Sequence, residues 1–448
     1  MYDDTIVAIA TPPGEGGLGV VRLSGAQAWA IASRFFDGTL QNGRVVHGYV
    51  RDAEAGVVVD EVLVTAMAAP RTYTREDVVE LTCHGSPVAL QRVVALALRH
   101  GARMANPGEF TLRAFLNGRI DLAQAEAVLD VIQAKTEAGL RLAVGGLRGG
   151  LSERVSAVRT RLLDLHAYFT ACIDFPEDEV ESQIEIDPPA MLAEAASGLK
   201  RLLEHADAGM VYRHGVRTAI VGRPNVGKSS LLNRLLGEDR AIVTGVPGTT
   251  RDTVEEVANV RGIPFHLVDT AGMHEARDEV EYLGIQRSRK AVEQADLLLL
   301  VVDGSVPITE ADRQVLALAD ARPFLAIANK SDLAPAFDLD DVPSPAIRVS
   351  ALTNEGLDDL TQAMAETVLG GGVHSDDAML VTNPRHKAAL ERALAHVAAA
   401  RHGLEAGTPE DLVTIDLAAS LAALGEITGD GVTEELLDTI FQRFCIGK

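Results

Sequence analysis

Residues 222–229 could bind a nucleotide phosphate chain. Their sequence, Gly222-Arg223-Pro224-Asn225-Val226-Gly227-Lys228-Ser229, matches the phosphate-loop pattern G-x-x-x-x-G-K-[ST]. The glycines let the backbone curve so that successive N–H groups face phosphate oxygens, and a following helix adds its positive end. We expect Lys228 to reach the β- and γ-phosphates and Ser229 to ligate Mg²⁺. The apolar run at 216–221 predicts the required strand, and the periodic run at 230–236 predicts the required helix.

Three further motifs indicate that the nucleotide is a guanine nucleotide. Asp269-Thr270-Ala271-Gly272 follows an apolar run, and it offers a carboxylate for Mg²⁺ and a glycine N–H for the γ-phosphate. Asn329-Lys330-Ser331-Asp332 follows the strand-like run 324–328, and Asp332 can accept both guanine donors, N1–H and N2–H₂. Ser350-Ala351-Leu352 would present backbone N–H groups to the guanine carbonyl. The order of the four motifs predicts a guanine-nucleotide domain.

The segment 244–252 is predicted to be the switch segment of this domain. Thr250 is the candidate for a second Mg²⁺ hydroxyl, ordered when the γ-phosphate is present. Many small GTPases carry Gln where this chain has Met273, so another group must stabilise the transition state. A monovalent cation held by the Asn225 carbonyl and switch carbonyls could do so. Glu281 either positions the water or is a solvated first-turn glutamate.

The predicted GTP-binding set shares these four motifs and the switch segment. It comprises Asn225, Val226, Gly227, Lys228, Ser229, Ser230, Thr244, Gly245, Val246, Pro247, Gly248, Thr249, Thr250, Asp269, Thr270, Ala271, Gly272, Asn329, Lys330, Ser331, Asp332, Ser350, Ala351 and Leu352.

Length and composition set the broad class of protein. The 448 residues are enough for about three domains. The net charge of −23 argues against broad non-specific nucleic-acid binding, so RNA contact requires a local basic patch or a partner protein. Cys83, Cys172 and Cys445 show no paired spacing, which is typical of a reducing cytosol without structural disulfides or zinc. The sequence contains no secretory signal and no apolar run of membrane-spanning length, so we expect a cytoplasmic protein.

The pattern of apolar and polar residues along the chain predicts a multidomain α/β protein with an inserted domain. Strands are expected at 4–10, 20–23, 57–67 and 77–82, and a helix at 87–100. An Ala/Leu-rich pattern typical of helices extends from 122 to 213 and occurs again from 383 to 448. We predict an α/β domain at 1–118, an all-α domain from 119–213 with 375–448, and an inserted Ras-like domain with a mostly parallel sheet at 214–372. The glycine run 370–372 is expected to be a flexible joint.

A second glycine-rich segment, 14–19, matches the dinucleotide pattern G-x-G-x-x-G. The residues after it, 20–23, have the pattern of a strand. A dinucleotide site needs a helix start there, so we interpret 14–19 as a tight loop between strands.

The C-terminal tail carries a separate signal. Val432, Leu436, Leu437, Ile440, Phe441 and Phe444 fall on one face of a predicted helix capped by Thr433. The helix leads to Cys445 and Lys448, and a nearby ammonium would make that thiol more reactive. The alternatives are a frayed end and a prenylation box, which Gly447 and Lys448 fit poorly.

Over its whole length the chain resembles the MnmE (TrmE) family of tRNA-modification GTPases. The resemblance is carried by Thr11-Pro12-Pro13-Gly14, Arg71-Thr72-Tyr73-Thr74, Pro107-Gly108-Glu109-Phe110, the Gly-Thr-Thr-Arg-Asp switch and the terminal Phe-Cys-Ile-Gly-Lys. It implies an N-terminal domain that binds a reduced folate (5,10-methylene- or 5-formyl-tetrahydrofolate) and forms a homodimer. The folate contacts implied for this chain are Arg22, Glu80, Arg119 and Lys448.

The resemblance also implies metal and catalytic residues. K⁺ would be bound by Asn225, Thr244, Val246 and Thr249, and Mg²⁺ by Ser229 and Thr250; the water-positioning acid would be Glu281. Cys445 matches the family's tail cysteine, and with Lys228 and Glu281 it completes the catalytic set. His274 stands where the family often has Arg, so the role of that arginine is not carried over to this chain. Arg119 stands where Lys is also common.

The implied activity is potassium-dependent GTP hydrolysis coupled to tRNA modification. With the flavoprotein MnmG, in a heterotetramer or larger complex, such proteins attach an aminomethyl or carboxymethylaminomethyl group to C5 of the wobble uridine. The folate supplies the one-carbon unit. The alternative is a ribosome-assembly or regulatory GTPase, which would not bind folate, and the lack of a basic RNA-binding module weighs against it. A stand-alone folate-dependent methyltransferase would not need intact nucleotide motifs.

Overall fold

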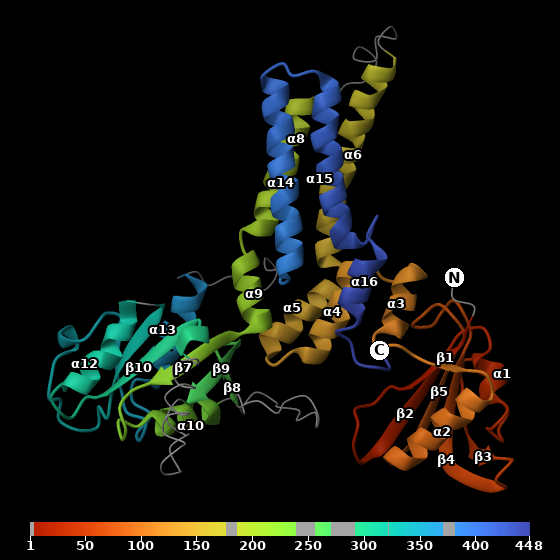
Figure 1. The fold of residues 1–448 in the computed structure, drawn as a ribbon, viewed down its shortest axis with the longest axis horizontal. Coiled ribbons are helices and arrows are strands. Elements are labelled where there is room, and N and C mark those ends of the chain that lie inside the picture. Colours follow the sequence, from red (N-terminus) through yellow and green to blue (C-terminus); the bar gives the residue numbers. More distant parts are fainter. Residues whose placement is uncertain (1–3, 176–185, 239–255, 270–291, 321, 371–380) are drawn as a thin grey trace. The chain divides into compact units, whose positions relative to one another are not determined.

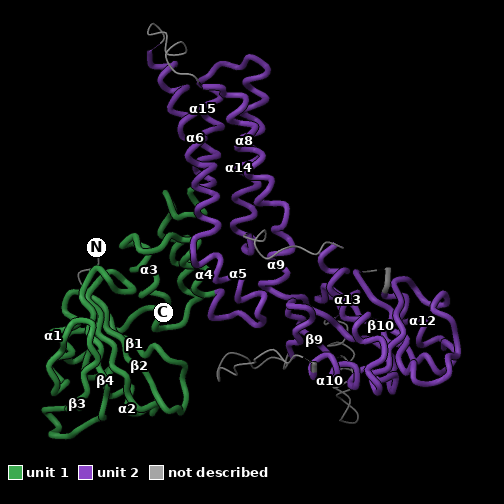
Figure 2. The backbone as a smooth tube through the Cα atoms, turned by 180° about the vertical axis from the view of Figure 1, so that it is seen from behind, with its two compact units in different colours: residues 1–129, 245–249, 425–448 green, residues 130–244, 250–424 purple. Residues whose placement is uncertain are grey.

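The computed structural model describes residues 4–175, 186–238, 256–269, 292–320, 322–370 and 381–448. These residues form two compact units, shown in different colours in Figure 2. The first unit comprises residues 4–129 and 425–448, and the second comprises the described residues between 130 and 424. Each unit contains one six-stranded sheet. The predicted multidomain α/β architecture is therefore confirmed.

The sheet of the first unit is mainly antiparallel and has the order β3-β4-β5-β2-β1-β6. Its strands are β1 (Ile6–Ile9), β2 (Gly16–Ser24), β3 (Val45–Asp52), β4 (Val57–Met67), β5 (Val78–Gly85) and β6 (Arg103–Met104). Helices α1 (Ala28–Ala32) and α2 (Pro87–Arg99) share a hydrophobic core with one face of this sheet. On the other face, Ile6 and Ala8 pack against Phe110 of α3 (Glu109–Leu116). Because side chains alternate along a strand, Arg22, which lies between the core residues Val21 and Leu23, shares the α3 face.

The glycine segment near the N-terminus corrects one prediction. Strand β2 begins at Gly16, so the loop interpretation is wrong for 16–19. The reason is tertiary packing: a Cβ at Gly19 would lie 2.5 Å from Leu90 Cδ1, and Gly85 meets the Gly16 backbone too closely for a Cβ. Glycine is used here for close approach within a sheet and against a helix. The strand continues through Ser24, so no helix start follows the glycines.

Seven helices form the described α-helical part. They are α4 (Leu122–Gln133), α5 (Glu137–Leu147), α6 (Gly150–Asp174), α8 (Pro188–Leu203), α9 (Ala206–His214), α14 (Pro384–Glu405) and α15 (Glu410–Thr428) (Figure 1). The helices predicted from 122 to 213 and from 383 onward are confirmed for the described residues. Helix α8 packs against both α6 and α14. Within the described part of the chain, no helix is long and apolar enough to cross a membrane.

The tail belongs to the first unit. Helix α16 (Glu434–Phe441) begins after Thr433, whose hydroxyl accepts the Leu436 N–H as predicted. Ile440, Phe441 and Phe444 are buried in a cluster with side chains of α3 and α4, and Val432, Leu436 and Leu437 pack at its edge. The predicted apolar helix face is confirmed, and it holds the C-terminus against the N-terminal sheet unit.

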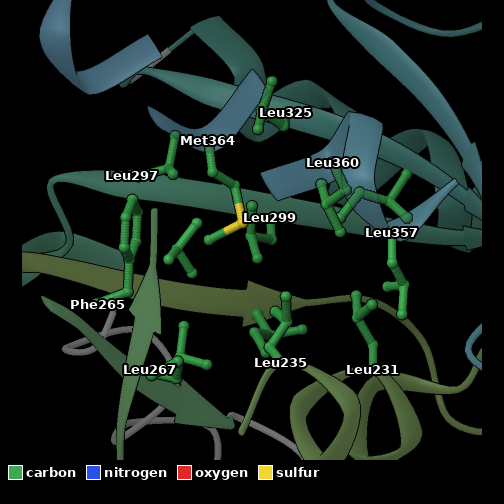
Figure 3. Close-up of a cluster of buried hydrophobic side chains, with 14 of the residues drawn as sticks. Leu231, Leu235, Phe265, Leu267, Leu297, Leu299, Leu325, Leu357, Leu360 and Met364 are labelled. Carbon is green, nitrogen blue, oxygen red and sulfur yellow. The ribbon is translucent and has the colours of Figure 1, made fainter. Parts of the chain in front are cut away.

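The second sheet is mostly parallel, as predicted, and has the order β12-β11-β10-β7-β9-β8. Its strands are β7 (Val216–Val221), β8 (Glu256–Val260), β9 (Ile263–Asp269), β10 (Leu297–Asp303), β11 (Phe324–Asn329) and β12 (Ala346–Val349), and only β8 runs antiparallel to its neighbour. Helices α10 (Lys228–Glu238) and α13 (Leu357–Leu369) bury Leu231, Leu235, Leu360 and Met364 on one face (Figure 3). Helix α12 (Glu310–Leu316) contributes to the core on the other face.

A buried ion network joins the N-terminus of the first unit to α3. The Arg113 side chain is 1% exposed, and its Nη2 lies 2.6 Å from Asp4 Oδ1 and 2.9 Å from Glu109 Oε1. Its Nη1 lies 3.2 Å from Glu76 Oε1. Burial alone would raise the pKa of Glu109, but the hydrogen bonds from Arg103 and Arg113 hold it below its ordinary value. Glu109 therefore contributes to the stability of the fold only while its carboxylate stays ionised.

Arg113→Met should lower the free energy of unfolding by about 3–5 kcal/mol at pH 7, because it leaves Glu109 buried without one of its cations. The folded-state pKa of Glu109 is depressed, so its contribution is present above the unfolded pKa and is lost as pH falls through the folded one. The difference between wild type and variant should therefore shrink in acid. Denaturant unfolding at several pH values measures it, with the exposed Arg92→Met as control. Equal stabilities at pH 7 would contradict this account.

Candidate functional site

The phosphate-loop sequence joins β7 to α10 in a tightly curved backbone. Gly222 passes so close to the Val301 carbonyl that a Cβ would collide with it. Gly227 has φ +97°, and a Cβ there would strike the Asn329 side-chain amide. Asn225 adopts φ 66°, in the left-handed region. The loop thus presents bare backbone before a helix N-terminus, which is the arrangement that binds phosphate.

Lys228 is held over this loop by the loop itself. The residue is 5% exposed, and its Nζ donates to the carbonyl oxygens of Gly222 and Arg223, both at 2.8 Å. Its neighbours Ser229 and Ser230 are exposed at the start of α10. The ammonium is therefore already positioned beside the backbone that would surround a phosphate.

Asn329 ties the phosphate loop to the predicted guanine loop. The residue is 2% exposed at the carboxyl end of β11. Its Nδ2 donates to the Val226 carbonyl at 2.8 Å, and its Oδ1 accepts the Ala351 N–H at 3.1 Å. Three of the four predicted motifs thus meet where parallel strands end, the usual ligand-binding edge of such sheets.

The two charged residues after Asn329 each have a partner. Lys330 Nζ lies 2.6 Å from Asp303 Oδ2 at the end of β10. Burial alone would raise the pKa of Asp303, but hydrogen bonds from Lys330 and Ser305 lower it below its ordinary value. Asp332 Oδ1 accepts the Ser350 hydroxyl at 2.5 Å. The Asp332 carboxylate is thus oriented by a residue of the next motif.

Two residues of this site were missed by the sequence reasoning. Asp303 ends the apolar run 297–302, and its place at a strand end was the available signal. Arg234 of α10 donates from Nε to the Ala351 carbonyl at 3.0 Å and from Nη2 to the Leu352 carbonyl at 3.2 Å. No local pattern marks that contact, because it spans more than 100 residues of sequence.

The switch side of the site lies outside the described residues. Asp269 is the last residue of β9, at the same edge of the sheet as the phosphate loop. Several predicted site residues fall outside the described ranges: Thr244, Gly245, Val246, Pro247, Gly248, Thr249, Thr250, Thr270, Ala271, Gly272 and Glu281. Met273 and His274 also fall outside them. In the ranges that are described, no three His, Cys, Asp or Glu side chains form a group that could hold a metal ion.

A second cluster of predicted residues lies in the first unit, on the α3 face of its sheet. Arg22 of β2 and Glu80 of β5 stand directly opposite each other, with Nε and Oε1 2.7 Å apart. Arg22 Nη1 also donates to the Gly447 carbonyl at 3.4 Å. Further along the tail, the Phe110 N–H donates to the Lys448 carbonyl at 3.2 Å. The tail therefore forms part of the wall around Arg22.

The Tyr73 ring contacts both arginines of this cluster. The guanidinium carbons of Arg22 and Arg119 lie 5.9 Å and 4.8 Å from its ring centroid. Its hydroxyl is hydrogen-bonded to the Thr111 hydroxyl at 2.9 Å, and Arg22 also lies over the Phe110 ring at 5.6 Å. The sequence reasoning assigned no role to either aromatic residue, which only the tertiary fold brings to the site.

Lys448 and Cys445 complete the cluster. Burial is the main cause that lowers the pKa of the Lys448 ammonium, and the Arg22 charge lowers it further, while Glu80 and Cys445 act in the opposite sense. Cys445 is exposed. Gly447 has φ +99°, and a Cβ there would collide with the Ile9 carbonyl, so only glycine fits this part of the tail.

Comparison with known proteins covers the whole chain. A family model described as "GTP-binding protein TrmE N-terminus" matches residues 5–119, and one described as "MnmE helical domain" matches residues 122–445. The "tRNA modification GTPase MnmE" of Chloroflexus aurantiacus is 52% identical over 461 residues, and that of Alkaliphilus oremlandii is 47% identical over 462, each covering 100% of both chains. Among solved structures, the G domain of the T. maritima FeoB iron transporter is 27% identical over 34% of this chain and 98% of its own, with a TM-score of 0.27.

Proposed function

The chain belongs to the MnmE family of tRNA modification GTPases, and we propose that it uses GTP, Mg²⁺ and K⁺ to drive, with the flavoprotein MnmG, modification of the wobble uridine of tRNA. The observation that carries the nucleotide part is Asn329, which bridges the phosphate loop and the guanine loop. In this proposal Lys228 neutralises developing charge on the β- and γ-phosphates, and Asp332 accepts the guanine donors.

The donor set at the loop fits the proposed metals. Ser229 is exposed at the helix start, and its hydroxyl together with that of Thr250 would hold Mg²⁺. Asn225 is exposed and in the left-handed region, so its side-chain oxygen is available to K⁺ beside Thr244, Val246 and Thr249. The cation would supply positive charge where an arginine finger acts in other GTPases. Glu281 would orient the attacking water.

The second cluster fits a reduced folate. Arg22 and Arg119 suit carboxylates, Glu80 suits the amino-pyrimidine edge of a pterin, and Tyr73 and Phe110 offer aromatic surface to a flat ring. Lys448 adds a half-buried cation at the wall formed by the tail. When bound, the folate would supply the one-carbon unit. The chain's own residues would orient it and hold the Cys445 thiol nearby.

The domain organisation follows from these roles. We propose a folate-binding and dimer-forming domain at 1–118, an inserted GTP-hydrolysing domain at 214–372, and a helical domain at 119–213 with 375–448, of which residues 425–448 pack with the first unit. The protein would act as a homodimer in a complex with MnmG. GTP hydrolysis would drive a conformational change and would not form the new bond on the uridine.

Cys445→Ser tests the proposal in a reconstituted reaction with MnmG, tRNA, GTP, K⁺ and methylene-tetrahydrofolate. We expect wobble-uridine modification, measured by nucleoside mass spectrometry, to fall at least about tenfold while GTP hydrolysis stays within about twofold, because a hydroxyl is a far weaker nucleophile than a thiol. Cys172→Ser is the matched control. Omitting the folate should abolish modification by the wild type. Unchanged modification by the variant would show that the Cys445 thiol takes no part in the reaction. Modification without folate would refute the proposal that folate supplies the one-carbon unit.

A further inference from the structure

Helices α8 and α14 form a shallow basic groove in the second unit. The groove has a volume of about 610 Å³, and small side chains such as Ala196 and Ser197 line it. Lys200 and Arg201 of α8 and Arg401 of α14 line the same groove, and all three are exposed. Glu204 is the one acidic lining residue.

The charge of this groove is opposite to that of the chain. Its lining has three basic residues to one acid, whereas the whole chain has 41 Lys and Arg to 64 Asp and Glu. In the described parts of the chain, neither Lys200 nor Arg201 has an acidic partner within ion-pair distance. Arg401 has only the exposed Glu405, with Nε and Oε1 3.6 Å apart. An exposed pair of this kind on one helix is weak and easily exchanged.

Favourable interaction with a helix dipole explains part of this arrangement. Lys200 and Arg201 lie in the last turn of α8, where cations stabilise a helix. That effect acts within one helix and does not account for a third cation that faces the same groove from α14. Two cations without acidic partners among the described residues and a third with only a weak pair, brought from two helices to one open groove, are suited to an anionic ligand.

We propose that this groove binds the phosphate backbone of tRNA. The inference rests on the proposed function, because a tRNA-modifying protein with a net charge of −23 needs a local basic patch or a partner protein to contact RNA, and this groove is such a patch. Three cations can neutralise up to three phosphates. A shallow groove suits backbone contacts, which position the RNA without reading its sequence.

The test compares two triple variants of the full-length chain. One carries Lys200→Ala, Arg201→Ala and Arg401→Ala. The control removes the same charge from exposed arginines of the first unit, with Arg34→Ala, Arg44→Ala and Arg92→Ala. Affinity for a tRNA with an unmodified wobble uridine is measured by fluorescence anisotropy, with and without MnmG, from about 50 to 200 mM salt. GTP hydrolysis is measured in parallel.

We expect the groove variant to bind tRNA at least about tenfold more weakly than the control, with a log–log salt slope smaller by about 2–3. Hydrolysis should be unchanged in both, and a purely structural role for the three cations would leave the slope unaltered. Equal affinity and slope in the two variants would overturn the inference, as would a loss of tRNA affinity by the groove variant that occurs only when MnmG is present. Failure of the wild type to bind tRNA in any arm would count against the proposed function itself.

Discussion

Lys228→Ala should reduce GTP hydrolysis at least about a thousandfold, which corresponds to about 4 kcal/mol of lost transition-state stabilisation. The structure gives the reason: the ammonium sits over the phosphate loop, held by the Gly222 and Arg223 carbonyls, so no reorganisation is needed when charge develops. Alanine removes that charge from a largely buried position.

The rate is measured by phosphate release at saturating GTP. The matched control is Arg217→Ala, which removes an exposed cation from the amino end of the same strand, β7. We expect the control to hydrolyse GTP at the wild-type rate. A Lys228 variant within about tenfold of wild type would contradict the phosphate-loop assignment.

Asp332→Asn should weaken GTP binding by about 10²–10³-fold, because an amide would place an N–H against the guanine donors that we propose the carboxylate accepts. Xanthosine triphosphate has a carbonyl where guanine has its amino group, so the variant should bind it more tightly than wild type does. The fold should survive, because the Ser350 hydroxyl can still donate to the remaining side-chain oxygen.

Competition between the two nucleotides for a fluorescent analogue measures both affinities. Asp338→Asn, at an exposed position of the same domain, is the control for a lost charge. If Asp332→Asn kept wild-type preference for GTP, the carboxylate would not be the group that recognises the base.

Sequence reasoning was most successful where one local pattern decides the structure. The strands at 57–67 and 216–221 coincide with β4 and β7, because apolar runs bounded by turns leave one interpretation. Thr433 and the apolar face that follows it predicted α16 for the same reason. One exception is 16–19, where glycines that look like a loop are needed for close packing in a strand.

The site was predictable only in part. Motif order placed Lys228, Asn329 and Asp332 at one sheet edge, since parallel strands end together. Asp303 pairs with Lys330, and Arg234 donates to the Ala351 carbonyl, each across a long separation in sequence. No sequence motif predicts such contacts. Tyr73 joins Arg22 to Arg119 through three separate segments of the first unit, which only folding brings together.

We propose that Asn225 and the switch segment use K⁺ in place of a catalytic glutamine. The most direct measurement is the initial rate of GTP hydrolysis at equal ionic strength in K⁺ and in Na⁺, for wild type and Asn225→Ala. We expect K⁺ to accelerate hydrolysis by the wild type at least about tenfold over Na⁺, and we expect the variant to lose this advantage. Equal wild-type rates in the two salts would contradict it.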